Sequence, residues 1–325
     1  MDNQCKDSDL ANFLEYQLPI FDELLAEEQM PLHQRPFAAT IQFVTYCIVA
    51  IEGDDKDNFL EKAWFKSFYQ LVSGWYSNRY GDAMKLDRDD SSLGVVLIYD
   101  TPFKMKIPLS IPGKKESAIK RWFCLPNEVL EKENVFDWIV KPPNLNKMSP
   151  EELSSLKTDL RTVANATRSI RVNLMTATLK ENDLRKLSSG IPPHIEKSVR
   201  DILSLDAGRI SNSIWEIHLA IEKSLKLLIR QRGHVPPNVH DLEKLCKIAS
   251  DINDVFIDSD LINNLPSHQE SIRHRYGEVG LVTVGQAVSH YKSALNILNN
   301  FTHALSRQFI MKNAEVLIQV PPWAR

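Results

Sequence analysis

At 325 residues with 43% apolar residues, the chain has room for about two globular domains with cores of ordinary size. Its 39 basic and 42 acidic residues leave a formal charge of -3, which excludes the overall positive charge of a protein that coats nucleic acid. The four cysteines lie far apart without a Cys-x-x-Cys pair, so the sequence indicates neither a disulfide framework nor a zinc site. A reducing cytosol fits this cysteine usage.

No segment indicates a membrane or export role. The longest apolar run, 43–51, is far shorter than the roughly 20 residues that cross a bilayer. The polar and acidic residues 1–9 do not fit a secretory signal or a basic transit segment. We therefore expect a cytoplasmic protein without a membrane partner.

Residues 8–80 are expected to be helical, with a break at Pro19. Apolar and aromatic side chains recur at steps of three and four, which is typical of helices that bury one face. The stripes are Leu10, Phe13, Leu14, Leu24 and Leu25; then Phe37, Ile41, Val44, Ile48 and Ile51; then Leu60, Trp64, Phe68, Leu71 and Trp75. Aromatic stripes at this spacing favour a bundle core, and a ligand or base-stacking platform is the alternative.

The sequence pattern of residues 93–126 indicates a small antiparallel sheet. Phe103, Met105 and Ile107 alternate with lysines, and the break at 100–102 indicates a hairpin turn. The most basic stretch of the chain follows here, and it is either a solvated face or a phosphate-contacting surface: Lys104, Lys106, Lys114, Lys115, Lys120 and Arg121. Residues 122–125 are expected to continue the sheet, with a short helix from Asn127 to Trp138 after it.

A domain boundary is expected at residues 141–144, because consecutive prolines resist both helix and central strand. Ser149, Pro150 and Glu152 then form the signature of a capped helix start. The residues 190–193, Gly-Ile-Pro-Pro, are expected to stop this helical region, and a short helix follows to Leu203.

A long amphipathic helix begins near Ile210. Its apolar stripe recurs at steps of three and four and consists of Ile210, Ile214, Ile217, Ile221, Leu225 and Leu228. Gly233 supplies the left-handed residue that commonly ends a helix, and Pro236 and Pro237 prevent it from resuming at once. The chain must therefore turn before His240.

Residues 220–226, Gly233 and the His-Asp-Leu of 240–242 resemble the first two helices of the HEPN superfamily, a four-helix module. The Arg-His-Arg-Tyr of 273–276 resembles the end of that family's third helix, expected over about 261–276. The stretch from Thr283 onward resembles the fourth helix, which is expected to start after Thr283 as its cap. The resemblance covers roughly residues 206–312 and implies a C-terminal four-helix bundle.

The expected fold class is mainly α, with a small antiparallel β insertion in a helical N-terminal region and a HEPN-like bundle at the C-terminus. The expected domains are a helical domain at 1–145 with its sheet at about 93–126, a connecting helical segment at 146–205, the bundle at 206–312, and a tail at 313–325. The tail is expected to contain a short extended segment.

Many members of this superfamily are metal-independent ribonucleases whose motif is an arginine, four to six residues, and a histidine. No arginine of this chain meets that spacing: Arg230 precedes His234 by three intervening residues, and Arg232 precedes His240 by seven. The departure argues against nuclease activity. Gly-rich phosphate loops, His-Glu-x-x-His and nucleophile elbows are also missing, and the sequence indicates no cofactor and no metal.

The candidate ligand-binding residues at the end of the third helix are Arg273, Arg275 and Tyr276. Two arginines could hold a phosphate bidentately, and their charge would keep His274 neutral and able to accept a proton. If the protein is an enzyme, Arg273, His274 and Arg275 are its candidate catalytic residues. The alternative is that Arg275 and Tyr276 only close the helix.

His218, Glu222 and Lys226 are four residues apart and share a helix face. These three side chains either stabilise one another on the helix surface or form a polar patch at a nucleotide site or dimer interface. His240 most simply helps to cap the following helix, and a catalytic role for it is the alternative.

The leading functional hypothesis is a non-catalytic module that binds a nucleotide or RNA. A homodimer and a protein partner contacted through 1–145 are further expectations. The resemblance implies a prokaryotic defence or toxin-antitoxin role. The alternatives are a ribonuclease with a non-standard site and a structural dimerisation protein.

Overall fold

The computed structural model describes residues 10–84, 90–253, 262, 265–278, 280 and 282–324. The chain divides into two compact units, each described by itself. Unit 1 comprises Met1–Asp89, Lys114–Arg121 and Leu317–Arg325, and unit 2 comprises Asp90–Gly113 and Trp122–Val316. The residues expected as a connecting segment, 146–205, pack within unit 2.

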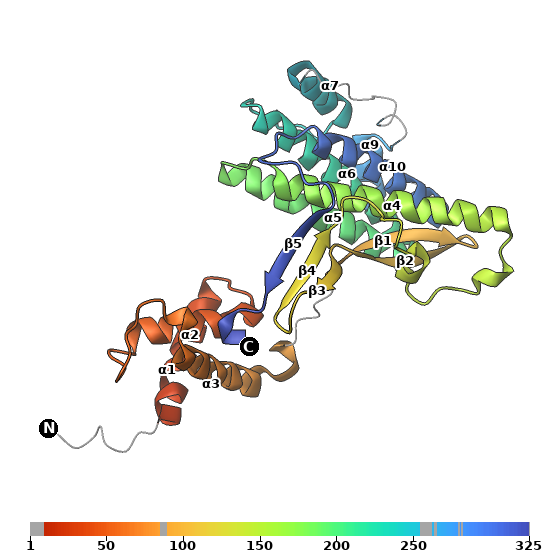
Figure 1. The fold of residues 1–325 in the computed structure, drawn as a ribbon. Helices are drawn as coiled ribbons and strands as arrows, with labels where there is room; N and C mark the ends of the chain where they lie inside the picture. Colours follow the sequence, from red (N-terminus) through yellow and green to blue (C-terminus); the bar gives the residue numbers. More distant parts are fainter. Residues whose placement is uncertain are drawn as a thin grey trace. The chain divides into compact units, whose positions relative to one another are not determined.

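The chain is mainly helical, which confirms the expected fold class (Figure 1). The helices are α1 (Leu10–Glu27), α2 (Arg35–Tyr46), α3 (Ala63–Tyr80), α4 (Pro150–Thr176), α5 (Asn182–Leu203), α6 (Ala207–Gln231), α7 (Leu242–Asn253), α9 (His268–Arg275) and α10 (Val284–His303). The strands are β1 (Ser91–Ile98), β2 (Thr101–Pro108), β3 (Ile111–Lys115), β4 (Lys120–Leu125) and β5 (Ala314–Gln319).

In unit 1, α1, α2 and α3 pack around a shared aromatic core. The core residues are Leu14, Leu18, Phe21, Leu25, Ala39, Phe43, Val72, Trp75 and Tyr76. The expected break at Pro19 is wrong, because α1 continues through this proline. A proline removes one helix hydrogen bond, and burial of Leu18 and Phe21 on either side offsets that loss.

The strands β1 and β2 form the expected antiparallel hairpin, with Ser91 opposite Pro108 and Ile98 opposite Thr101. The turn residues are Tyr99 and Asp100, with φ values of 50° and 58°. Two left-handed residues match the twist of adjoining strands and make the tightest hairpin connection. The turn therefore lies just before the expected 100–102, since Thr101 and Pro102 already belong to β2.

The strands β3, β4 and β5 form a second sheet in that order. β4 includes residues 122–125, and β5 lies in the expected extended tail. The helix expected from Asn127 to Trp138 is absent from this described stretch, which has only a short 3-10 turn at Val135–Trp138, capped by Asn134. Asn127 instead exchanges two hydrogen bonds with Asn313: each side-chain oxygen accepts from the other residue's amide, at 3.2 and 3.0 Å.

The helix α4 starts at the predicted cap. Ser149 Oγ accepts from the Glu152 amide at 3.2 Å, and the Glu152 carboxylate accepts from the Ser149 amide at 2.7 Å. This reciprocal pair satisfies two amides that a helix start leaves without partners. The prediction from the sequence is confirmed here.

The expected stop at 190–193 is wrong, because α5 runs without interruption through Pro192 and Pro193. Its residues Ile191, Ile195, Val199 and Ile202 are buried, and α5 packs along α6. This apolar contact outweighs the two hydrogen bonds that prolines cannot make. The consequence is local: the carbonyls of Ser188 and Ser189 lack the amide donors four residues later.

The C-terminal bundle is built from α6, α7, α9 and α10. All six residues of the predicted α6 stripe are buried, and Gly233 has a φ of 84° just after the helix. The helix α10 begins at the predicted Thr283 cap, which forms a second capping box with Gln286. The expected start of the third helix at 261 lies outside the described residues, and α9 begins at His268. The helices α4 and α5 also pack on α10 and α6 (Figure 1).

Candidate functional site

Four aromatic rings from three parts of the bundle stack on one another in unit 2. Trp215 and His218 of α6 lie 5.6 Å apart with nearly parallel rings. His268 lies 5.2 Å from His218 and 5.3 Å from His240, again between ring centres. We call Trp215, His218, His240 and His268 the Trp-His cluster.

Local sequence explains how these rings meet. Trp215, His218 and Glu222 follow steps of three and four along α6 and therefore share one face. His240 comes directly before Asp241, whose side chain accepts from the Lys244 amide and starts α7. His268 is the first residue of α9. The starts of two helices thus meet a single face of α6.

Glu222 is the buried carboxylate of this face, with 6% of its surface exposed. It accepts hydrogen bonds from Lys226 Nζ at 2.7 Å and from His240 Nδ1 at 3.0 Å. Burial is the largest single effect and would raise the pKa of Glu222, but the hydrogen bonds and charges of Lys226 and His240 together outweigh it, so the pKa lies below its usual value. Glu222 is therefore ionised at neutral pH and fixes both partners.

His218 is held in its neutral form by the fold. Its Nε2 donates to the His240 carbonyl oxygen at 2.8 Å, so this nitrogen carries the proton. Burial lowers the pKa of His218, although the bond to His240 acts in the opposite direction. The other ring nitrogen, Nδ1, is buried and has no hydrogen-bond partner among the residues that the structure describes, and the same is true of Nδ1 of His268. The cluster thus contains two unused acceptor or donor positions.

Arg275 connects the cluster to the surface. Its guanidinium carbon lies 5.3 Å from the Trp215 ring centre and 5.8 Å from that of Tyr276. Arg275 is exposed, and 68% of the Tyr276 surface is exposed. Arg273 is also exposed, and no ion pair engages it in the described part of the chain. The end of α9 therefore presents Arg275 beside an open aromatic ring and Arg273 as a second exposed cation on another side of the helix.

The expected reason for a neutral His274 needs correction. The pKa of His274 is lowered mainly by burial, with a smaller effect from Arg273 and an opposing one from Glu270. Arg275 makes no such contribution, because it turns toward Trp215. Consecutive helix residues point about 100° apart, so Arg273, His274 and Arg275 do not converge on one point. As a catalytic triplet they are poorly placed.

His218, Glu222 and Lys226 lie on one face of α6, as their spacing predicts. His240 contacts this face as well. Sequence reasoning missed Trp215 and His268 altogether. The helix spacing of Trp215, His218 and Glu222 was an available signal for the first of these. His268 lies fifty positions from His218, and nothing in the local sequence places it against α6.

A cavity of about 410 Å³ adjoins His268 at the starts of α7 and α9. It is lined by Asp241, Glu243 and Glu270 among others, so its charge is unfavourable for a phosphate. Among the described residues, no group of three or more His, Cys, Asp or Glu side chains is arranged to hold a metal ion. The basic side chains Arg273 and Arg275 lie instead in the last turn of α9, at its opposite end.

Residues 201–307 match the HEPN domain family. The match extends from the last turn of α5 through α10, and it confirms the resemblance carried by the short motifs. No curated protein and no solved structure matches the chain. Within the described residues, no helix has a stretch long and apolar enough to span a membrane.

Proposed function

With a HEPN domain at residues 201–307 as the premise, we propose that this protein is a non-catalytic module that binds single-stranded RNA or a nucleotide at the end of α9. The observation that carries the proposal is the position of Arg275, between the Trp215 ring and the exposed Tyr276 ring. We call Arg273, Arg275 and Tyr276 the α9 end surface.

The α9 end surface has the two components that unpaired nucleic acid requires. An exposed aromatic ring offers a stacking face for a base, worth about 1–3 kcal/mol per base. The guanidinium groups of Arg273 and Arg275 can donate to phosphate oxygens. Arg275 is already supported by Trp215, so less conformational entropy is lost when it meets a ligand.

The buried part of the Trp-His cluster has a supporting role in this proposal. Glu222 holds His240 and Lys226, and His218 holds the chain before α7 through the His240 carbonyl. These contacts fix α7 against α6 and keep Trp215 beneath Arg275. Among the residues expected to bind ligand, Arg273, Arg275 and Tyr276 would touch it, while His218, Glu222 and Lys226 would position them.

The test is fluorescence anisotropy of the full chain with a labelled single-stranded oligouridylate and with a labelled ATP analogue. Affinity for the RNA should fall several-fold when salt rises from about 50 to about 200 mM, because two phosphate contacts release counterions. The double variant Arg273→Ala/Arg275→Ala should lose binding at least about tenfold, as expected for two charged hydrogen bonds. Tyr276→Ala should weaken binding, and Tyr276→Phe should preserve it.

The matched control is Lys157→Ala/Lys186→Ala, which removes two exposed positive charges from α4 and α5. This control should bind RNA as the unaltered protein does. Equal losses in both double variants would reduce the effect to net charge and contradict the proposal. Absence of any salt-sensitive binding would favour a purely structural dimerisation protein instead.

A ribonuclease is the second candidate, and the His240-Glu222 pair favours it. A histidine oriented by a carboxylate can act as a general base, and half of the His240 side chain is exposed. In the binding assay, intact oligouridylate should be recovered after incubation. Cleavage that His240→Asn abolishes while binding persists would replace the binding module with this enzyme.

Partner, assembly and biological role complete the proposal. Residues 1–145 would contact a protein partner, and two HEPN domains would pair in a homodimer that works in the cytoplasm in a prokaryotic defence or toxin-antitoxin system. Light scattering of the full chain should give twice the mass of 37.2 kDa. A monomeric mass at all concentrations would contradict the pairing.

A further inference from the structure

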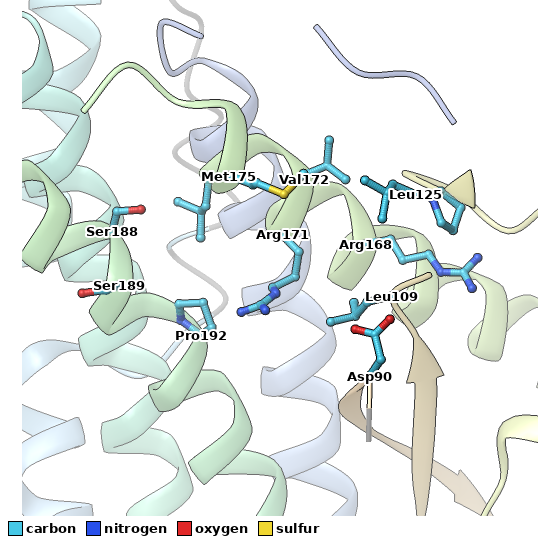
Figure 2. Close-up of a pocket in the computed structure, with 12 residues that line it drawn as sticks. Asp90, Leu109, Leu125, Arg168, Arg171, Val172, Met175, Ser188, Ser189 and Pro192 are labelled. Carbon is cyan, nitrogen blue, oxygen red and sulfur yellow. The ribbon is translucent and has the colours of Figure 1, made fainter. Parts of the chain in front are cut away.

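A cavity of about 370 Å³ lies outside the HEPN-matched residues, between α4, α5 and the strands of unit 2 (Figure 2). Its volume is within the range of small-molecule sites. Apolar side chains supply most of its wall, namely Leu109, Leu125, Pro126, Val172, Leu174, Met175 and Pro192. The polar lining residues are Asp90, Arg168, Arg171, Ser188 and Ser189.

Arg168 is the fixed part of this wall. It is fully buried, and its guanidinium makes two hydrogen bonds of 2.7 Å to the Glu133 carboxylate. Two further bonds go to the carbonyls of Pro108 and Glu128. The charge of Arg168 is thus already compensated, and its role is to join α4 to the strand ends.

Arg171 is the cavity-lining cation for which the described part of the chain supplies no ion-pair partner. It lies three residues after Arg168 on α4, is exposed, and no described residue pairs with it. Figure 2 shows its guanidinium group between Pro192 and Leu109. A guanidinium between apolar side chains is less hydrated than one in open solvent, so an anion would bind it more strongly.

Asp90 limits the charge of the anion that fits. Its carboxylate accepts from Ser110 Oγ and lines the same cavity without an ion pair to Arg171. Asp90 offsets part of the attraction that Arg171 exerts on any anion, and a dianion loses more hydration than a monoanion when it enters a cavity with apolar walls. The combination of one cation, a nearby carboxylate and apolar walls selects a singly charged group on an apolar body.

The two prolines inside the continuous helix α5 lie beside the same cavity. Pro192 and Pro193 have no amide hydrogen, so the carbonyls of Ser188 and Ser189 lack their usual helix donors. Both serines line the cavity. The stretch of α5 that contains two prolines thus coincides with one wall of the cavity.

We propose that this cavity binds a small amphipathic carboxylate, with its carboxylate on Arg171 and its apolar body against Leu109, Met175 and Pro192. The two carboxylate oxygens match the two parallel donors of the guanidinium. The site is separate from the α9 end surface, so it can be tested whether or not the protein binds RNA.

The experiment is a titration of the full chain with octanoate, followed by saturation-transfer NMR on the octanoate methylene signals. Octan-1-ol and octylamine serve as the neutral and cationic counterparts, and octyl phosphate as the more highly charged anion. Octanoate should bind more tightly than all three. Arg171→Ala should weaken octanoate at least about tenfold, the size of a charged hydrogen bond, and Arg171→Lys should weaken it less.

The control is Lys157→Ala, which removes an exposed cation from the same helix. It should leave octanoate binding unchanged. Equal affinity of Arg171→Ala and the unaltered protein for octanoate, or octan-1-ol binding as tightly as octanoate, would overturn the proposal. So would the absence of octanoate binding to the unaltered protein.

Discussion

Nδ1 of His240 lies 3.0 Å from a carboxylate oxygen of Glu222, a residue that is almost completely buried. Lys226 donates to the same carboxylate. Replacing Glu222 with Ala leaves two donors without their acceptor, and we expect the free energy of unfolding to fall by about 2 kcal/mol. Urea denaturation measures this change. Glu196→Ala is the control, because 28% of the Glu196 side chain and 58% of its partner Arg200 are exposed, so water screens this pair and it should contribute less than about 0.5 kcal/mol. A similar loss in both variants would contradict the structural role of Glu222.

Acid should destabilise the protein through the Trp-His cluster before its carboxylates protonate. The pKa values of His218 and His268 are lowered mainly by burial. The unfolded chain therefore binds more protons than the folded chain near pH 6, and stability present above the ordinary pKa of about 6.5 is lost as the pH falls through it. We expect the melting temperature to fall from pH 7.5 to pH 5.5, and His218→Gln to reduce this dependence. An unchanged slope in His218→Gln would show that other groups are responsible.

Glu222 contributes in a lower pH window. Because its folded pKa lies below its usual value, its stabilisation is present above that value, about 4.5, and is lost as the pH falls toward the lower folded pKa. Glu222→Gln should therefore lose stability at pH 7 and approach the unaltered protein at pH 3.5. Melting curves at the two pH values test this, and a constant difference between the two proteins would contradict it.

The pair Arg168-Glu133 should be costly to break and cheaper to replace. Arg168 is fully buried, and its removal leaves the Glu133 carboxylate without its main partner. We expect Arg168→Ala to lower the free energy of unfolding by about 3–5 kcal/mol. The double variant Arg168→Met/Glu133→Leu should recover part of this loss, because no buried charge then remains. If the double variant lost as much free energy of unfolding as the two single variants together, the other contacts of Arg168 would dominate its contribution to stability.

Two glycines of unit 2 should respond oppositely to alanine. A Cβ at Gly94 would lie 3.0 Å from Ile107 Cδ1 and 3.1 Å from Val163 Cγ1, where β1 meets β2 and α4. Gly94→Ala should therefore cost about 1–3 kcal/mol through overpacking. A Cβ at Gly190 would meet only the flexible end of Lys223, so Gly190→Ala should be neutral or stabilising by up to about 1 kcal/mol in the helix. Thermal unfolding ranks the two variants, and the reverse order would contradict the described packing.

Several elements followed directly from the sequence because their causes are local. The caps at Ser149 and Thr283 were predictable, since a capping box needs only residues three positions apart. The apolar stripe of α6 and the alternation in β2 were predictable from their periods of 3.6 and 2. The HEPN resemblance rested on the order of such motifs, which the family match confirmed.

Tertiary structure decided what local patterns left open. Pro19, Pro192 and Pro193 indicated breaks, but burial of their neighbours keeps α1 and α5 continuous. Packing of α5 on α6 depends on residues far away in the chain, so no local rule could weigh it against a lost hydrogen bond. The contacts within the Trp-His cluster and around the cavity at Arg171 likewise join residues that are far apart in the chain, so local patterns could not predict them.

The sequence by itself determined the helical class, the HEPN module and the residue types that could bind a phosphate. Only the tertiary structure placed His268 on His218 and turned Arg275 onto Trp215. It also left Arg171 without a described partner beside an apolar cavity. Helix periodicity fixes which side chains share a face, but which faces meet depends on the free energy of burying all of them together.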